Sequence, residues 1–346
     1  MHIPDGYLSP STCAALYVGA APFWYVAAKR TNRLLHSRLM PRISLFAAFS
    51  FVLMMFNIPL PGGTTGHATG IGIATVVLGP WASMLSISVA LAIQAIIFGD
   101  GGITAIGANC FNIAILGSLA TWGVYKLLTV SAAAGSPRRV FAAGLAGYVG
   151  LNVAALATAI EFGIQPSLFR DANGAPLYAP YPLHIAIPAM MIGHLTIAGL
   201  AEFFVASGLT AFIQRTDPTL LGNATTTEPQ QTSTRRLWMV LGILLMLTPL
   251  GILAAGTAWG EWGASDFADP EARKQIAAAS LNAPLPVHPP QGLAKLSSIW
   301  TAPVPDYAPV FLKSESFGYM MSGIFGVGLV IFASQIVAWI VRRART

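Results

Sequence analysis

Long, uninterrupted apolar stretches limit what this chain can fold into more than any other feature. A helix that crosses a bilayer needs about 20 mostly apolar residues. The segments that meet this requirement are 8–28, 42–60, 80–98, 103–128, 139–163, 183–213, 237–256 and 317–341. Only 9% of the residues are charged, against about 25% in a typical soluble domain. Because a water-soluble fold would need far more ionic surface, the sequence predicts an all-α, polytopic membrane protein whose surface contacts lipid.

A shorter apolar stretch, 68–78, is closed by Gly79-Pro80 and is too short to cross comfortably alone. It is either a half-helix or a short span that returns at the proline. Counting it predicts nine crossings, with the N-terminus outside and the C-terminus inside. Cytoplasmic loops are enriched in Lys and Arg, and this orientation leaves few of the 19 basic residues outside. Those outside are Arg170, Arg273, Lys274, Lys295 and Lys313.

The loops divide the chain into two parts. Residues 1–213 hold about seven helices with short connections, and residues 237–346 hold two helices around a large extracytoplasmic loop rich in Pro and Ala. The polar segment between them, 214–236, contains a Thr, Gln and Ser run at 225–234, which is typical of a flexible cytoplasmic linker. The net charge is +6, but its basic residues are scattered at the ends of apolar runs. That pattern does not indicate a nucleic-acid partner.

The N-terminus offers an unusual set of nitrogen donors. No basic segment precedes the first apolar run, so no cleavable signal peptide is expected and Met1 is the expected mature terminus. The Met1 α-amine, the His2 backbone nitrogen and the His2 imidazole can close fused five- and six-membered rings around one ion. Only metals that displace an amide proton bind in this way, which points to Cu(II), Ni(II) and Co(II). Zn(II) prefers tetrahedral sites, and Ca(II) and Mg(II) prefer oxygen.

A fourth nitrogen is available on the same predicted face of the membrane. His67 lies in the outside loop 57–70, which is rich in Gly and Thr. Thr64 and Thr65 are candidates to hold its imidazole from outside the coordination sphere. From these residues alone, His2 as an ordinary terminal residue and His67 as an interfacial one remain the alternative.

Three stretches of the sequence resemble the CbiM/NikM family, the substrate-binding (S) components of energy-coupling-factor transporters for cobalt and nickel. These are MHIPDGYLS at 1–9, TTGH at 64–67 and GDGGITAIGAN at 99–109. The resemblance covers about residues 1–213 and implies a metal held by the Met1 amine, both His2 nitrogens and the His67 imidazole. It also implies a transmembrane coupling (T) component and a cytoplasmic ATPase pair as partners, in the bacterial cytoplasmic membrane.

The C-terminal part resembles the small NikN partner, fused here. The residues that carry this resemblance are Pro305-Asp306-Tyr307, expected near the outer surface, and GYMMSG at 318–323. This tail favours Ni(II) over Co(II) as the transported substrate, with a Co(II) uptake subunit for cobalamin synthesis as the alternative.

Other polar residues in or near the apolar segments have two interpretations each. Gln94, Asp100 and Asn109 are candidates to support the metal ligands, and equally to cap helices or bond between them. Glu202 is expected to pair with a neighbouring helix or face a coupling partner. The remaining candidates are weaker and are interpreted mainly as packing, entrance or loop residues: Glu161, His184, His194 and His288.

Two further classes of function are alternatives to metal capture. A stand-alone channel or carrier predicts ionisable residues along a membrane pathway, and the spans are nearly free of them. An intramembrane metalloenzyme needs a general base beside an open metal position, for which Asp5 is the one candidate. No Walker A loop or catalytic motif is present. The sequence therefore predicts a transport subunit and no enzyme.

Overall fold

The computed structural model describes all residues except 33–38, 222–233, 255, 310 and 344–346. Most of the predicted linker run at 225–234, and Arg33, Arg38 and Arg345 of the predicted inside loops, lie outside the described residues. The named elements are α1 (Pro10–Asn32), α2 (Leu39–Met54), β1 (Ile58–Leu60), β2 (Thr64–Gly66), α3 (Ile71–Ile93), α4 (Ile106–Asn109), α5 (Ser118–Thr129), α6 (Pro137–Leu168), α7 (Leu183–Gly193), α8 (Gly199–Thr216), α9 (Arg235–Leu247), α10 (Pro270–Ala279), α11 (Gln291–Leu296) and α12 (Glu315–Arg343). Short π-helical segments continue α3 through Phe98 and join α4 to α5 and α7 to α8.

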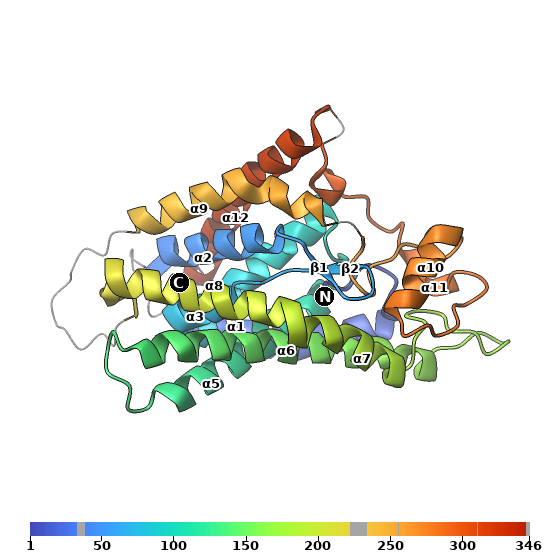
Figure 1. The fold of residues 1–346 in the computed structure, drawn as a ribbon, viewed down its shortest axis with the longest axis horizontal. Coiled ribbons are helices and arrows are strands. Elements are labelled where there is room, and N and C mark those ends of the chain that lie inside the picture. Colours follow the sequence, from blue (N-terminus) through green and yellow to red (C-terminus); the bar gives the residue numbers. More distant parts are fainter. Residues whose placement is uncertain (33–38, 222–233, 255, 310, 344–346) are drawn as a thin grey trace.

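The long helices lie side by side along the longest axis of the molecule (Figure 1). Among the described residues, six helices are long and apolar enough to cross a membrane, and they match predicted crossings. They are Ile71–Phe98, Ile106–Thr129, Pro137–Leu168, Leu183–Thr216, Arg235–Leu253 and Glu315–Ile340. The helices α1 and α2 overlap the predicted crossings 8–28 and 42–60, but α1 is not among the six and the apolar part of α2, Met40–Met54, is shorter. The chain is a multi-pass membrane protein, and the full count of nine crossings stays a prediction.

The helical stretch Ile71–Phe98 is kinked at Gly79. This glycine has φ 75° and ψ 167°, a left-handed, non-helical conformation that favours a residue without a side chain. The hydroxyls of Thr75 and Ser83 share a hydrogen bond of 3.0 Å, although eight residues of a straight helix would separate them by about 12 Å. The chain therefore bends sharply at Gly79-Pro80, where the sequence predicts either a half-helix or a short span that returns at the proline.

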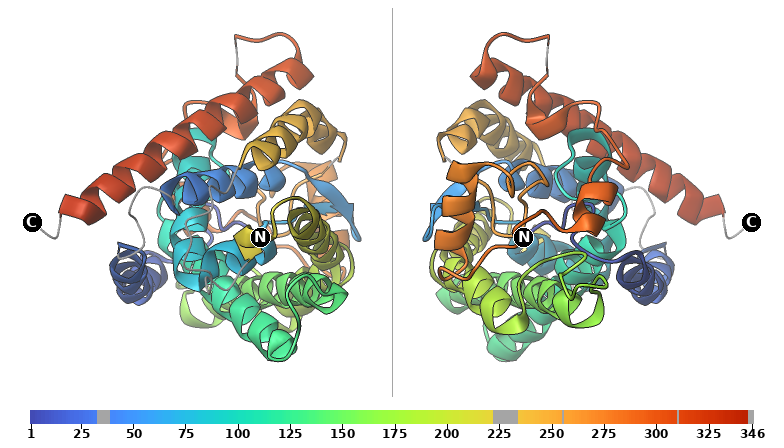
Figure 2. Two further views of the ribbon diagram at one scale, coloured as in Figure 1. Left: turned by 90° about the vertical axis from the view of Figure 1, so that its left-hand side faces the viewer. Right: turned by 90° about the vertical axis from the view of Figure 1, so that its right-hand side faces the viewer.

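The 57–70 segment, expected to be an outside loop, is mostly buried and forms a small antiparallel hairpin. Strand β1 pairs with β2 in the register Ile58–Gly66, Pro59–Thr65 and Leu60–Thr64. Thr64, Thr65 and His67 are at most 6% exposed. The chain N-terminus lies near this hairpin, and Figure 2 shows it near the centre of the bundle in both end views. The hairpin and the terminus thus enter the bundle together.

The C-terminal part, residues 235–343, adds two helices to the bundle and a cover at one end. Helices α9 and α12 both pack against α2, and the Tyr319 hydroxyl donates to the Met55 carbonyl at 2.8 Å. The connection between α9 and α12 carries α10 and α11, which lie at the right-hand end of the bundle in Figure 1. There the Gly292 N–H donates to the Leu177 carbonyl at 2.7 Å. This cover brings residues of the C-terminal part to the end of the bundle where the N-terminus lies.

Candidate metal site

The N-terminal segment is fixed inside the bundle by side chains and by its own carboxylate. The N–H of Ile3 donates to Oδ1 of Asn109 at 2.8 Å, and Nδ2 of Asn109 donates back to the Ile3 carbonyl at 3.1 Å. Asp5 accepts hydrogen bonds from two backbone N–H groups of the 99–105 loop at 3.1 and 2.8 Å. These contacts hold the backbone on both sides of Pro4. The position of Met1 is therefore set by the fold of the bundle.

Met1, His2 and His67 converge although His67 is far from the terminus in sequence. The centroids of the His2 and His67 rings are 5.0 Å apart, with an angle of 43° between the ring planes. All three residues are at most 6% exposed. Nε2 of His2 is buried without a hydrogen-bond partner, and no hydrogen bond from the His2 backbone N–H is found, among the residues that the structure describes. The α-amine and the two imidazoles that the sequence predicts as donors thus lie together in a buried place.

The loop that carries His67 is held by a buried carboxylate of α8. Glu202 is fully buried and accepts hydrogen bonds from the N–H groups of Thr69 (2.7 Å), Gly70 (2.9 Å) and Gly72 (2.9 Å). These groups lie at the N-terminus of α3, where unpaired N–H groups and the helix dipole favour a negative charge. Glu202 therefore fixes the chain directly after His67. The expectation that it pairs with a neighbouring helix is met through backbone donors.

Asp100 connects the His2 ring to both parts of the chain. Its Oδ1 is in hydrogen-bond contact with Nδ1 of His2. Its Oδ2 accepts from the Tyr307 hydroxyl at 2.7 Å and from Nε2 of Gln94 at 3.1 Å. Nε2 of Gln94 also donates to the Tyr307 hydroxyl at 2.8 Å. Since only Nδ1 of His2 can close the six-membered chelate ring, a chelated metal must replace the contact with Asp100.

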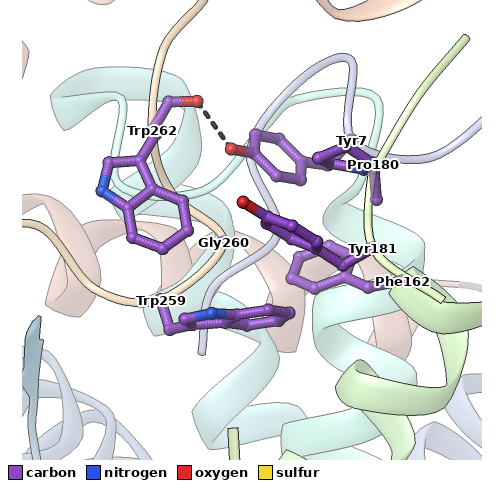
Figure 3. A pocket seen from close by; sticks show the side chains of 8 residues that line it. Tyr7, Phe162, Pro180, Tyr181, Trp259, Gly260 and Trp262 are labelled. Carbon is purple, nitrogen blue, oxygen red and sulfur yellow. Dashed lines mark hydrogen bonds between the residues drawn. The ribbon is translucent and has the colours of Figure 1, made fainter. Parts of the chain in front are cut away.

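A second carboxylate, Glu261 of the C-terminal part, contacts the α-amine. Oε1 of Glu261 is 3.1 Å from the Met1 nitrogen. Glu261 lies between two tryptophans, which belong to an aromatic cluster shown in Figure 3. The cluster consists of Tyr7, Phe162, Tyr181, Trp259 and Trp262. Each of the two donor groups of the terminus, the amine and Nδ1 of His2, is therefore held by a carboxylate.

A cavity of about 360 Å³ lies between the N-terminal block, residues 1–213, and the C-terminal part. Four carboxylates are among its lining residues, and no Lys or Arg is among the described residues that line it. His67 lines the same cavity. The lining carboxylates are Asp100, Glu261, Asp306 and Glu315. A space with this charge attracts cations and discourages anions.

Burial and neighbouring charges set the protonation of the site. Burial lowers the pKa of His67 well below its usual value, and the nearby His2 and α-amine lower it further. His67 is therefore neutral at pH 7, the form that binds metals. Burial alone would raise the pKa of Asp100, but His2, His67 and the hydrogen bond from Tyr307 hold it below its usual range. Asp100 is therefore an ionised carboxylate next to the rings of His2 and His67.

The residues predicted to support the metal ligands take different positions. Asn109 contacts the backbone after His2, and Gln94 contacts Asp100. The Thr64 hydroxyl donates to the Pro61 carbonyl at 3.5 Å, and Nδ1 of His67 is 3.2 Å from the Ala68 carbonyl. Among the described residues, neither Thr64 nor Thr65 hydrogen-bonds the His67 ring. Their supporting role stays a prediction.

The weaker candidates lie in other contacts. Glu161 accepts from Nδ2 of Asn112 at 2.8 Å, and Nδ1 of His194 is 2.8 Å from the Met190 carbonyl. Neither His184 nor His288 is among the residues that line the carboxylate-lined cavity.

Tyr307 is 5% exposed and its hydroxyl reaches Asp100; its expected place near the outer surface stays a prediction. It extends into the bundle because its ring stacks on Phe98, with centroids 4.6 Å apart.

Glu261 was missed from the sequence. The signal that marks it is a carboxylate enclosed by aromatic residues, Trp259-Gly260-Glu261-Trp262, in a chain with only 13 acidic residues. Among the described residues no group of three or more His, Cys, Asp and Glu side chains is placed to hold a metal. The predicted donor set is of a different kind, because two of its four nitrogens belong to the backbone.

The sequence matches two known families along most of its length. Residues 2–220 match the CbiM family, described as a cobalt uptake substrate-specific transmembrane region, and residues 234–343 match a PDGLE domain. The chain is 56% identical over 331 residues to the fused nickel transport protein NikMN of Rhodobacter capsulatus, covering 96% of this chain and 95% of the relative. It is 40% identical over 332 residues to the "Probable fused nickel transport protein LarMN" of Lactiplantibacillus plantarum, covering 94% of each.

A solved structure agrees with the fold of the larger block. The crystal structure of a truncated transition metal transporter aligns with a TM-score of 0.58 and 48% sequence identity. The alignment covers 62% of this chain and 99% of that chain. The fold and the sequence matches therefore point to the same class of membrane protein.

Proposed function

Because the chain belongs to the CbiM family of substrate-specific transmembrane regions, we propose that it is the substrate-capture subunit of a Ni(II) importer. The family is one of transport proteins and not of enzymes. Ni(II) is the substrate, and it is chelated by the Met1 amine, the backbone and Nδ1 nitrogens of His2, and the His67 imidazole.

The single observation that carries the proposal is the convergence of Met1, His2 and His67 in a buried place beside a carboxylate-lined cavity. Four nitrogens in one plane suit Ni(II) and Cu(II) and do not suit Zn(II) or Mg(II). Loss of the amide proton is required for this chelate, so the proposal also predicts tighter binding as the pH rises. His67 is neutral already and contributes no proton to that dependence.

Co(II) is the second candidate substrate. The description of the matching family names cobalt uptake. The names of the R. capsulatus and L. plantarum relatives, which match over nearly the whole chain, refer to nickel transport. The full-length similarity to fused nickel proteins favours Ni(II). A coupling component in the membrane and an ATPase pair on the cytoplasmic side complete the proposed importer, with the chain N-terminus outside.

Metal binding by the purified full-length protein tests this function. We expect a single Ni(II) ion per chain with the visible absorption of a square-planar complex, and weaker binding of Co(II). His2→Asn removes the imidazole while keeping a polar side chain beside Asp100, and it abolishes this complex. His67→Asn removes the fourth donor and weakens binding by at least about 100-fold, more than the loss of a supporting residue around a metal.

The matched control is His184→Asn, which changes a histidine away from the cavity and leaves binding unchanged. Ni(II) should also protect the Met1 amine from acylation by an active ester, as measured by mass spectrometry of the N-terminal peptide. Wild-type affinity in His2→Asn, or an amine that stays reactive with Ni(II) bound, would show that the terminus is not the metal site.

A further inference from the structure

The contact between Glu261 and Met1 connects the C-terminal part of the chain to the N-terminus at the proposed metal site. In this ion pair the Met1 side chain is 1% exposed and the Glu261 side chain is 23% exposed. The paired nitrogen is an ammonium, and its lone pair is not available to a metal. The ion pair and the metal–amine bond therefore exclude each other at the same nitrogen.

Glu261 is held in this position by its neighbours in sequence. The Tyr7 hydroxyl donates to the Trp262 carbonyl at 2.8 Å, and the Trp259 indole donates to Ser280 Oγ at 3.1 Å. The ring of Trp259 lies 6.0 Å from that of Phe162. These contacts fix the backbone on both sides of Glu261; Figure 3 shows Trp259, Gly260 and Trp262 packed beside Tyr7 and Phe162.

Gly260 permits this packing. Its φ is +84°, and a Cβ there would lie 2.4 Å from the Phe162 ring. A side chain at this position would push the segment away from α6, and with it Glu261. The segment Trp259-Gly260-Glu261-Trp262 is thus suited to holding the Glu261 carboxylate at a fixed position in the bundle.

Glu261 also faces the cavity that His67, the proposed fourth ligand, lines. It lines the same cavity as His67 and Asp100. A metal bound by both the amine and His67 must sit between them, next to this cavity. To bind, it has to displace the carboxylate from the amine.

We propose that Glu261 is an internal competitor of the metal, a carboxylate from the C-terminal part that holds the Met1 amine when no metal is bound. A contact that stabilises only the metal-free state weakens metal binding by the same free energy. The C-terminal part thereby lowers the affinity of a chelate that would otherwise release its metal slowly. This inference rests on the proposed function, because it takes the Met1 amine as a ligand.

The test compares Ni(II) affinity and dissociation in full-length wild type, Glu261→Gln and the control Glu271→Gln. Glu271 is 77% exposed and, among the described residues, forms an ion pair with Lys274 on its own helix. We expect Glu261→Gln to bind Ni(II) about 3- to 10-fold more tightly, as for a partly exposed charged hydrogen bond lost from the metal-free state. Dissociation into excess chelator slows by a similar factor and the absorption spectrum does not change. Glu271→Gln behaves as wild type.

Two further measurements separate competition from a purely structural role. In the metal-free protein, Glu261→Gln exposes the Met1 amine, so acylation of that amine becomes faster. Glu261→Asp keeps the charge at a shorter reach and gives an intermediate affinity. Equal or weaker Ni(II) binding by Glu261→Gln, with unchanged acylation, overturns the inference.

The outcome is distinguishable from a failure of the proposed function. His2→Asn is measured in the same assay. If it binds Ni(II) like wild type, the chelate itself is wrong. If it loses Ni(II) while Glu261→Gln binds no more tightly than wild type, the chelate stands and only the competition is wrong.

Discussion

The N-terminal block and the C-terminal part contribute different chemistry to the same site. The block supplies the proposed nitrogen donors, namely the Met1 amine, His2 and His67. The C-terminal part supplies oxygen groups that hold those donors, because Glu261 contacts the amine and Tyr307 contacts Asp100, which holds His2. The C-terminal part therefore contacts the donors although it holds none of the proposed ligands.

The two contributions also differ in how firmly they are built. Within the block, Glu202 accepts three backbone N–H groups and Asn109 makes two hydrogen bonds to Ile3, all buried. Glu261 makes a single contact to the amine and is partly exposed. We therefore expect substitutions in the block to have large effects on metal binding and on stability, and substitutions in the C-terminal part to have small ones.

Glu202→Gln should give the largest effect of the supporting residues. The amide presents an N–H group towards backbone donors that the carboxylate now accepts, so at least one buried N–H loses its partner. We expect the free energy of unfolding to fall by about 2 kcal/mol and Ni(II) affinity to fall about 10- to 100-fold, as when a group behind a metal ligand is lost. Thermal unfolding and Ni(II) titration in detergent measure both.

Glu161→Gln is the matched control for Glu202→Gln. Glu161 is also a buried membrane-segment carboxylate, but it accepts a hydrogen bond from Asn112 and, among the described residues, none from the His67 loop. Its substitution should leave Ni(II) affinity within about twofold, since the ligands keep their positions. A similar loss of affinity in both variants would mean that Glu202 acts only through general stability and that the block holds His67 in some other way.

Acid should destabilise the metal-free block through His67. Its pKa is lowered in the folded protein, so below about pH 6.5 the unfolded chain binds a proton there that the folded chain does not. Stability then falls with decreasing pH, by at most about 1.4 kcal/mol per pH unit from this group. Melting of the metal-free protein between pH 7 and 5 measures the slope, which His67→Gln should reduce. An unchanged slope in His67→Gln would mean that a group other than His67 causes the acid sensitivity.

Much of the fold follows from the sequence because apolar runs of bilayer length leave the chain few alternatives. Five of the six candidate spans lie within about five residues of their predicted bounds, and the sixth, Ile71–Phe98, joins the predicted stretches 68–78 and 80–98 across the Gly79-Pro80 pair. The 57–70 segment adds a feature that the sequence did not predict, the pairing of β1 with β2, which satisfies its backbone where the segment is buried.

The site is only partly readable from sequence, for a physical reason. A terminal amine followed by histidine can chelate by itself, so Met1 and His2 are candidates from local chemistry. Glu261 and Tyr307 act across more than 200 residues of chain, and each reaches the site through aromatic packing that no local pattern indicates. For Thr64 and Thr65, nearness to His67 in sequence does not give a hydrogen bond to its ring among the described residues, and their supporting role stays a prediction.

Tyr307→Phe should give the smallest effect and sharpen the comparison most. It removes the hydroxyl that donates to Asp100 and accepts from Gln94, while the ring keeps its stacking on Phe98. Asp100 then holds His2 less firmly, so we expect Ni(II) affinity to change by only about two- to fivefold, the size of one hydrogen bond. The control is Tyr319→Phe, whose hydroxyl donates to the Met55 carbonyl and does not reach Asp100. Both variants lose one buried hydroxyl of the C-terminal part, so both should lower the melting temperature similarly. Only Tyr307→Phe should alter metal binding, and an equal effect of both would mean that the C-terminal part acts on the site through its packing alone.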